Sequence, residues 1–331
     1  MERREFIIFL SSALLSSAGI AWPLAAQAQP RTKLPTIGYL GASTLSVTNE
    51  RVAAFVQRLR ELGWIDGQTI AIEYRWAEGR TGRFADIAAE FVRLKVDVIV
   101  TAGAGPVAAA KEATSNIPIV FTIASDPVGT GLVSSLSRPG GNVTGMSYEG
   151  PDISTKRIEL LREIIPGLRR FAVMANSGAA GAMRELQEIE TAAGPIGLEV
   201  MPVIIQRAQD IVSAFVSVKG RAEALYVCAD PLVNTNRLSI ITLALEARLP
   251  AIFGERENAE DGGLISYGPH IPDLYRRGAE QVDKILRGTK PGEIPIEQPT
   301  RFELVINLKT AKALSLTIPE SFLVRADKVI E

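Results

Sequence analysis

Small and polar residues follow several apolar runs of the sequence, and their types suit the binding of a small ligand. The stretches are 41–44, 101–105, 124–126, 176–177 and 229–230. Where strands and helices alternate, ligands bind beyond the carboxyl ends of the strands, because small residues allow close approach and helix N-termini offer free N–H donors. One such loop is typical of an ordinary turn or helix cap. Five loops around one cleft would indicate a binding site.

The expected ligand is a small carboxylate with an apolar part, such as an aromatic amino acid or an aromatic acid. Backbone N–H groups and hydroxyls at helix N-termini bind carboxylates. The stretches that could supply these donors are Ser43, Thr44, Thr101 and 103–105.

Two aspartates, Asp126 and Asp230, follow predicted strands in different halves of the chain. Facing one another across a cleft, one could accept hydrogen bonds from a ligand amine, while Tyr148 and Tyr267 pack on its apolar body. Each Asp also precedes a proline, which is typical of a turn, so both roles stay open. The full set of expected ligand-binding residues is Ala42, Ser43, Thr44, Thr101, Gly103, Ala104, Gly105, Ser125, Asp126, Ser147, Tyr148, Asn176, Asp230, Glu255 and Tyr267.

The segment 103–108 supports an alternative function. It reads G-x-G-x-x-A between a predicted strand and a predicted helix, and Asp126 lies 23 residues after Gly103. That layout is typical of a dinucleotide site and would make the protein an exported nucleotide-dependent oxidoreductase. Two strands precede this unit, whereas the fingerprint normally occupies the first. A bound dinucleotide would be visible in the absorbance of the purified protein.

Few residues of the chain suit catalysis or metal binding. The 331 residues include one Cys, Cys228, and one His, His270, so an intrachain disulfide is excluded and a His-based site would depend on one residue. The segment 145–149 lacks the last Gly of a nucleophile elbow, and the acidic stretch 257–261 is more typical of a solvated turn than of a metal site. We therefore expect no catalytic residue, metal or cofactor. With 36 Lys and Arg against 37 Asp and Glu, a nucleic-acid partner is not expected.

Residues 1–28 have the features of an export signal. Arg3 and Arg4 precede an apolar stretch, and Ala26-Gln27-Ala28 is an A-x-A cleavage site. We expect cleavage after Ala28 and a periplasmic, soluble mature protein, because no later segment has 18 uninterrupted apolar residues. The arginine pair resembles a twin-arginine signal, and the choice between that route and general secretion stays open.

Apolar periodicity predicts alternating strands and helices along the mature chain. We expect strands at 36–40, 69–74, 96–101, 117–122, 171–175, 198–204, 224–228, 251–253, 263–267 and 302–308. We expect helices at 50–62, 84–92, 106–114, 153–165, 182–193, 210–218, 234–247, 271–286 and 309–314. This order indicates an α/β fold of two doubly wound parallel-sheet lobes. The tail suggests that the chain crosses between lobes several times, which would form a hinge. The expected lobes are 33–147 with 267–287, and 148–266 with 291–331.

Six long motifs make the chain similar to the substrate-binding proteins of ABC transporters, in the branch that includes tryptophan- and tyrosine-type uptake proteins. They are LGWIDGQ (62–68), EYRWAEG (73–79), DPVG (126–129), RPGGNVTG (138–145), SYGP (266–269) and FELVINLKTAK (302–312). The resemblance covers essentially all of the mature chain. It implies a periplasmic-binding-protein-like fold of type I with three crossovers, an ABC permease as partner, and ligand binding without catalysis. The family often has Asn-Pro where this chain has Asn176-Ser177, so the ligand could differ.

Overall fold

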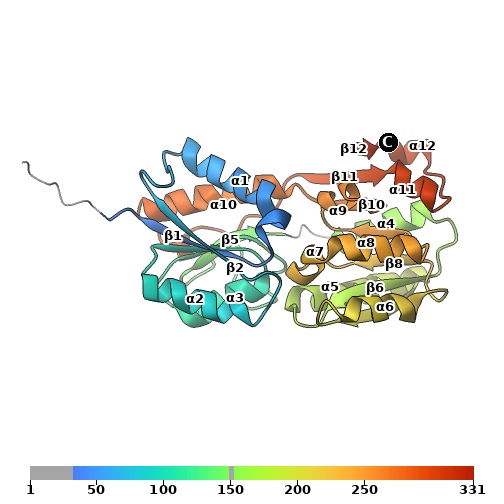
Figure 1. The fold of residues 1–331 in the computed structure, drawn as a ribbon, viewed down its shortest axis with the longest axis horizontal. Coiled ribbons are helices and arrows are strands. Elements are labelled where there is room, and N and C mark those ends of the chain that lie inside the picture. The colour runs from blue at the N-terminus through green and yellow to red at the C-terminus, as the bar shows by residue number, and fades with distance from the viewer. Residues whose placement is uncertain (1–32, 149–152) are drawn as a thin grey trace, which may run out of the picture. The chain divides into compact units, whose positions relative to one another are not determined.

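Two sheets organise the chain in a computed structural model, which describes residues 33–148 and 153–331 (Figure 1). One sheet has five parallel strands in the order β2-β1-β3-β4-β5. The other has seven strands in the order β12-β11-β10-β9-β8-β6-β7, with β10 and β11 antiparallel. We call the first sheet and its helices the first lobe, and the second sheet and its helices the second lobe.

The first lobe is a three-layer sandwich. Its strands are β1 Thr36–Gly41, β2 Ala71–Trp76, β3 Val98–Thr101, β4 Ile119–Ala124 and β5 Val143–Ser147. Its helices are α1 Leu45–Glu61, α2 Arg83–Leu94, α3 Ala104–Ala113 and α10 Ile271–Leu286. Helices α1 and α10 pack together on one face, and α2 and α3 on the other (Figure 1). Apolar side chains of the sheet contact both helix layers, which explains why its central strand β3 is buried throughout.

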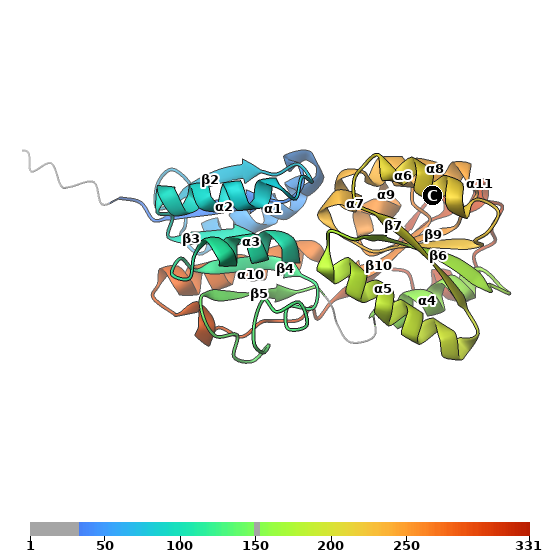
Figure 2. The same cartoon turned by 90° about the horizontal axis from the view of Figure 1, so that it is seen from below.

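The second lobe has the same layering. Its strands are β6 Arg170–Asn176, β7 Glu199–Ile205, β8 Ala224–Val227, β9 Ala251–Phe253, β10 Ile265–Pro269, β11 Phe302–Asn307 and β12 Lys328–Ile330. Its helices are α4 Ile153–Ile164, α5 Ala180–Ala193, α6 Asp210–Val218, α7 Pro231–Thr235, α8 Arg237–Glu246, α9 Arg256–Glu260, α11 Leu308–Ala313 and α12 Glu320–Leu323. One core lies between the sheet and α4, α5 and α11, and the other between the sheet and α6, α7 and α8. Figure 2 shows α4 and α5 on one face of this sheet and α6 and α8 on the other.

The strand order repeats between the lobes. Counted along the chain, both β1–β5 and β6–β10 follow the order 2-1-3-4-5. In this topology the connections leave in opposite directions from the first and third strands, and a crevice opens between them at their carboxyl ends. The fold therefore places one ligand-binding crevice beyond β1 and β3, and a second beyond β6 and β8.

Several expected elements differ from those observed. Helix α1 begins at Leu45, earlier than expected, and the helix expected at 234–247 is divided into α7 and α8. The Gly-rich passage 129–145 leads into β5, which the sequence did not predict. The acidic stretch 257–261 forms most of α9 rather than a solvated turn, and its carboxylates are paired with arginines.

The tail crosses between the lobes as the pattern suggested, but the expected residue boundaries do not match the sheets. Tyr267, assigned to the first lobe, lies in β10 of the second. Conversely, Ile294 and Ile296, assigned to the second lobe, are buried in the cores of the first. Helix α10 packs against α1 and β4. The chain therefore changes lobe before α10 and again before β11.

No helix within the described ranges is long and apolar enough to cross a membrane. The expected signal sequence and cleavage site at 1–28 lie outside the described residues.

Candidate functional site

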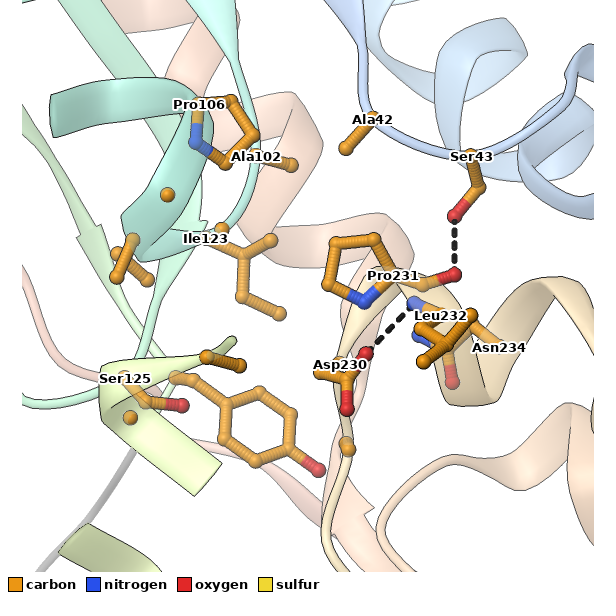
Figure 3. Close-up of a pocket in the computed structure, with 18 of the residues that line it drawn as sticks. Ala42, Ser43, Ala102, Pro106, Ile123, Ser125, Asp230, Pro231, Leu232 and Asn234 are labelled. Atoms are coloured by element: carbon orange, nitrogen blue, oxygen red, sulfur yellow. Dashed lines mark hydrogen bonds between the residues drawn. The ribbon is translucent and has the colours of Figure 1, made fainter. Parts of the chain in front are cut away.

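A cavity of about 110 Å³ lies where the crevices of the two lobes face one another. Its walls come from the loops after β1 and β3 in the first lobe, and from those after β6 and β8 in the second. That volume is several times what one water molecule needs, so the cavity can hold a small organic ligand. Figure 3 shows Ala102, Pro106 and Ile123 on one side of the space and Asp230 and Pro231 on the other.

Three helices begin at this cavity without a side-chain cap. The side chains of the N-cap residues Thr44 of α1, Gly103 of α3 and Ala179 of α5 accept no hydrogen bond from the backbone N–H groups of the first turn of their helices. Each helix is at least ten residues long, and the first N–H groups of a helix have no partner within it. The positive ends of three helix dipoles and their free donors thus converge from both lobes, which suits an anionic group of a ligand.

Gly103 is required at its position for its backbone conformation. Its φ is 94°, in the region that L-residues with a side chain rarely adopt. A Cβ there would also lie 3.5 Å from Pro231 of the opposite lobe. That distance is an ordinary van der Waals contact, so the need for glycine comes from the backbone conformation and not from the space beside the second lobe.

Asp230 combines a capping role with a free carboxylate oxygen. Its Oδ1 accepts hydrogen bonds from the backbone N–H groups of Leu232 and Val233, at 2.6 and 3.2 Å, and from Asn176 Nδ2 at 3.3 Å. Its Oδ2 is buried and has no hydrogen-bond partner among the described residues. The residue is only 6% exposed and lines the cavity. Burial raises the pKa of this carboxyl to about 6, against the opposing effect of its hydrogen bonds.

Arg51 carries the cationic side chain in the cavity wall, and its charge is already neutralised. It projects from α1 in the first lobe, and its Nη2 lies 2.6 Å from Glu255 Oε2 and 3.0 Å from Glu257 Oε1 in the second. Asn234 Nδ2 donates to the same Glu255 carboxylate at 3.0 Å. Arg51 and Glu255 are 5% and 4% exposed. A guanidinium held by two carboxylates is not free to bind a ligand anion.

Further contacts join the lobes around the cavity. Ser43 Oγ donates to the Pro231 carbonyl oxygen at 3.3 Å (Figure 3). On another side, Asp126 pairs with Arg184 of α5, and its Oδ1 accepts from the Gly129 N–H at 2.9 Å. With these contacts made, the lobes are closed over the cavity.

Ten of the fifteen expected ligand-binding residues line this cavity: Ala42, Ser43, Gly103, Ala104, Gly105, Ser125, Tyr148, Asn176, Asp230 and Glu255. The other five lie outside the lining. The Thr101 hydroxyl donates to the Leu40 carbonyl oxygen inside the sheet, and Thr44 contacts Ser46. Ser147 lies at the end of β5.

Two of the expected ligand contacts require correction. Tyr267 stacks on Phe302 at 6.0 Å between ring centroids and packs against the core of the second lobe, away from the cavity. Asp126 does not face Asp230 across the cleft but is bound by Arg184 and Gly129. A dinucleotide site would need both the loop at 103–108 and an aspartate that binds the ribose. Asp126 was the expected aspartate, and it does not line the cavity.

The sequence reasoning missed the continuation of the loop after Asn176 and part of the apolar lining. Gly178, Ala179 and Gly181, around the start of α5, also line the cavity. The small residues at 178–182 match the signal of the other four loops and could have been found by extending the stretch after Asn176. Phe84 and Tyr275 also line the cavity, but they come from helices, where side chains that face a ligand resemble ordinary core residues.

Comparison with known proteins agrees with this geometry. Residues 46–330 match the family model for ABC transporter substrate binding proteins. A tyrosine-binding protein of Clostridioides difficile is 30% identical over 263 residues, which cover 79% of this chain and 75% of that protein.

Two solved structures are similar over 90% of this chain. An ABC domain from Streptococcus pneumonia in complex with L-Trp is matched over its full length, at 25% identity and a TM-score of 0.85. The ligand-free, open structure of a substrate-binding protein with adhesive properties from Clostridium difficile is matched over 99% of its length, at 28% identity and a TM-score of 0.65. The chain belongs to the family of ABC transporter substrate-binding proteins, and its fold is that of type I periplasmic binding proteins.

Proposed function

We propose that this protein captures a zwitterionic amino acid with an apolar, aromatic side chain between its lobes and delivers it to an ABC permease. The observation that carries the proposal is that one part of the cavity wall suits a negatively charged group of the ligand and another part suits a positively charged group. Three helix N-termini without side-chain caps suit the ligand carboxylate. The free Oδ2 of Asp230 suits the ligand ammonium.

The remaining lining suits an apolar ligand body. Phe84, Ile123, Tyr148 and Tyr275 contribute aromatic and aliphatic surface to the cavity. Aromatic rings stack favourably on such surfaces. The relatives that bind tyrosine and L-Trp support an aromatic amino acid as the ligand.

The arrangement of the lobes supports capture by closure. The chain matches the L-Trp complex with a TM-score of 0.85 but the open, ligand-free relative with 0.65, although both alignments have similar identity and coverage. Ligand binding then stabilises the closed arrangement, and opening at the permease releases the ligand. Binding without turnover is the expected behaviour.

Export to the periplasm completes the proposal. The Arg pair, the apolar stretch and the A-x-A site at 26–28 support a signal that is removed after Ala28. In the periplasm the protein can bind its ligand before the ligand reaches the permease.

A set of ligands, in which two analogues each lack one charged group of the amino acid, tests the proposed chemistry. We expect L-tryptophan and L-tyrosine to raise the melting temperature, with about 2.7 kcal/mol of stabilisation at 100 times the dissociation constant. Indole-3-propionate lacks the ammonium and tryptamine lacks the carboxylate, so each should bind far more weakly. Equal stabilisation by tryptophan and by either analogue would contradict the zwitterion site, and protein-dependent conversion of any ligand would contradict binding without turnover.

The raised pKa of Asp230 predicts weaker binding in acid. The ammonium requires the ionised carboxylate, whereas the free protein binds a proton there below about pH 6. The dissociation constant for L-tryptophan should therefore rise about fivefold between pH 6 and pH 5 and be nearly flat from pH 7 to pH 8. Because this pKa is raised above its unfolded value, the ionised group destabilises the ligand-free fold above pH 6, and acidification relieves that cost. Titration calorimetry across this range should find the slope in the wild type and lose it in Asp230→Asn.

A further inference from the structure

Arg157 is a completely buried guanidinium that the proposed function does not use. It projects from α4 and is 0% exposed. Its Nη1 donates to Glu185 Oε1 at 2.7 Å and to the Tyr226 hydroxyl at 3.0 Å. Its Nη2 donates to the Tyr148 hydroxyl at 2.9 Å, and its Nε to the Tyr267 carbonyl oxygen at 2.7 Å. The carboxylate of Glu185 balances the charge of Arg157, and the other guanidinium N–H donors named above have hydrogen-bond partners. A buried ion pair needs both to offset the cost of desolvation.

Tyr148 connects this arginine to the ligand cavity. Its backbone N–H donates to the Ala124 carbonyl oxygen at 2.9 Å, which fixes the main chain to the first lobe. Its hydroxyl donates to the Gly254 carbonyl oxygen at 2.8 Å in the second lobe. Burial raises the pKa of the Tyr148 hydroxyl, so the group stays neutral and able to donate. The side chain between these two anchors lines the cavity.

The same arginine contacts both sides of the hinge. Tyr148 directly follows β5, where the chain leaves the first lobe. Tyr267, whose carbonyl oxygen accepts from Arg157, lies in β10 just before the chain returns to form α10. One side chain therefore holds two passages that are about 120 residues apart in the sequence.

The Tyr148 hydroxyl packs directly against the backbone of the second lobe at Gly254. A Cβ at Gly254 would lie 2.2 Å from the Tyr148 Oη and 2.8 Å from Arg157 Nη2. Glycine at 254 is therefore needed for the close approach of the tyrosine to the second lobe.

We propose that Arg157 is a positioning residue, which orients the Tyr148 ring in the ligand cavity and fixes the two hinge passages relative to one another. This inference rests on the proposed function for its ligand, but the hinge contacts can be measured without one. Arg157 touches no ligand itself; it acts through the hydroxyl of Tyr148 and the backbone of Tyr267.

A double-mutant cycle tests the proposal with L-tryptophan and L-tyrosine as probes. Tyr148→Phe keeps the ring but removes its hydroxyl, and Arg157→Lys keeps the charge but loses the forked donors. We expect each to raise the dissociation constant about tenfold, because one or two hydrogen bonds are lost. The double variant should bind only slightly more weakly than either single variant, since both substitutions disrupt the same hydrogen bond between Arg157 and the Tyr148 hydroxyl. Tyr226→Phe is the matched control: it removes a hydroxyl that bonds to Arg157 and Glu185 but lies outside the cavity lining, and it should change affinity less than twofold.

Hydrogen exchange of the ligand-free proteins is the second measurement. Amides at 145–148 and 265–269 should exchange faster in Tyr148→Phe and Arg157→Lys than in the wild type or Tyr226→Phe. If the wild type binds neither amino acid, the proposed ligand class fails and this exchange comparison still decides the positioning role. Wild-type affinity in Tyr148→Phe, additive effects in the cycle, or unchanged exchange at both passages would each overturn the proposal.

Discussion

Replacing Asp230 with asparagine is expected to weaken L-tryptophan binding by about 10- to 150-fold, the equivalent of about 1.5–3 kcal/mol for a charge-assisted hydrogen bond. The substitution is nearly isosteric. Asn can keep the Oδ1 contacts to the N–H groups of Leu232 and Val233, because asparagine is as good an N-cap as aspartate. What changes is Oδ2, which loses its charge and becomes a donor that repels the ligand ammonium.

The stability of the ligand-free protein separates this effect from misfolding. The buried carboxylate of Asp230 has a raised pKa, so its ionised form is unfavourable in the fold at neutral pH. The melting temperature of Asp230→Asn should thus equal or exceed that of the wild type, while calorimetry finds the loss of affinity.

Asp126→Asn is the matched control for this prediction. Asp126 also follows a strand and precedes a proline, but it lies outside the cavity lining and pairs with the half-exposed Arg184. An exposed ion pair contributes about 0–1 kcal/mol, so affinity should fall by less than about fivefold. Equal losses in the two variants would contradict a specific ammonium contact at Asp230.

The loops of the site were predictable from sequence because they are local. Ser43, Gly103, Ser125, Asn176 and Asp230 each follow an apolar strand within a few residues. Parallel topology brings the carboxyl ends of strands to one edge, so the position of such a residue along the chain fixes its place in the fold.

Side-chain direction was not predictable from the same information. Asp126 and Asp230 have similar neighbours in the sequence, yet one pairs with Arg184 and the other keeps a buried free oxygen. Tyr148 and Tyr267 both lie near crossovers, but only Tyr148 lines the cavity. Tyr267 lies in β10, where side chains alternate between the two faces of the sheet. The other three residues lie in the turns after strands, where this alternation does not set the side-chain direction.

The interlobe ion pair was missed for a different reason. Arg51 and Glu255 are about 200 residues apart and belong to different lobes. Arg51 lies on an amphipathic helix whose charged residues are normally solvated, and here it is buried against carboxylates of the opposite lobe. No local pattern identifies a partner that is brought near by a hinge.

Replacing Arg51 with methionine is expected to open the ligand-free protein and to weaken L-tryptophan binding by about 100-fold. In the closed arrangement the substitution leaves Glu255 and the neighbouring Glu257 without their cation. Removal of one partner from a buried ion pair destabilises a structure by about 3–5 kcal/mol. Here the lobes can separate and hydrate both carboxylates, so the penalty falls on closure rather than on folding.

Small-angle scattering and calorimetry together check this prediction. The radius of gyration of ligand-free Arg51→Met should exceed that of the wild type and return toward it at saturating L-tryptophan, because the ligand must then supply the closure energy. Arg184→Met is the control: it also removes an interlobe arginine, but Arg184 is half-exposed, so its loss should change affinity by less than about fivefold. An Arg51→Met protein that is as closed as the wild type without ligand and binds L-tryptophan equally tightly would show that the Arg51 pair does not hold the lobes together.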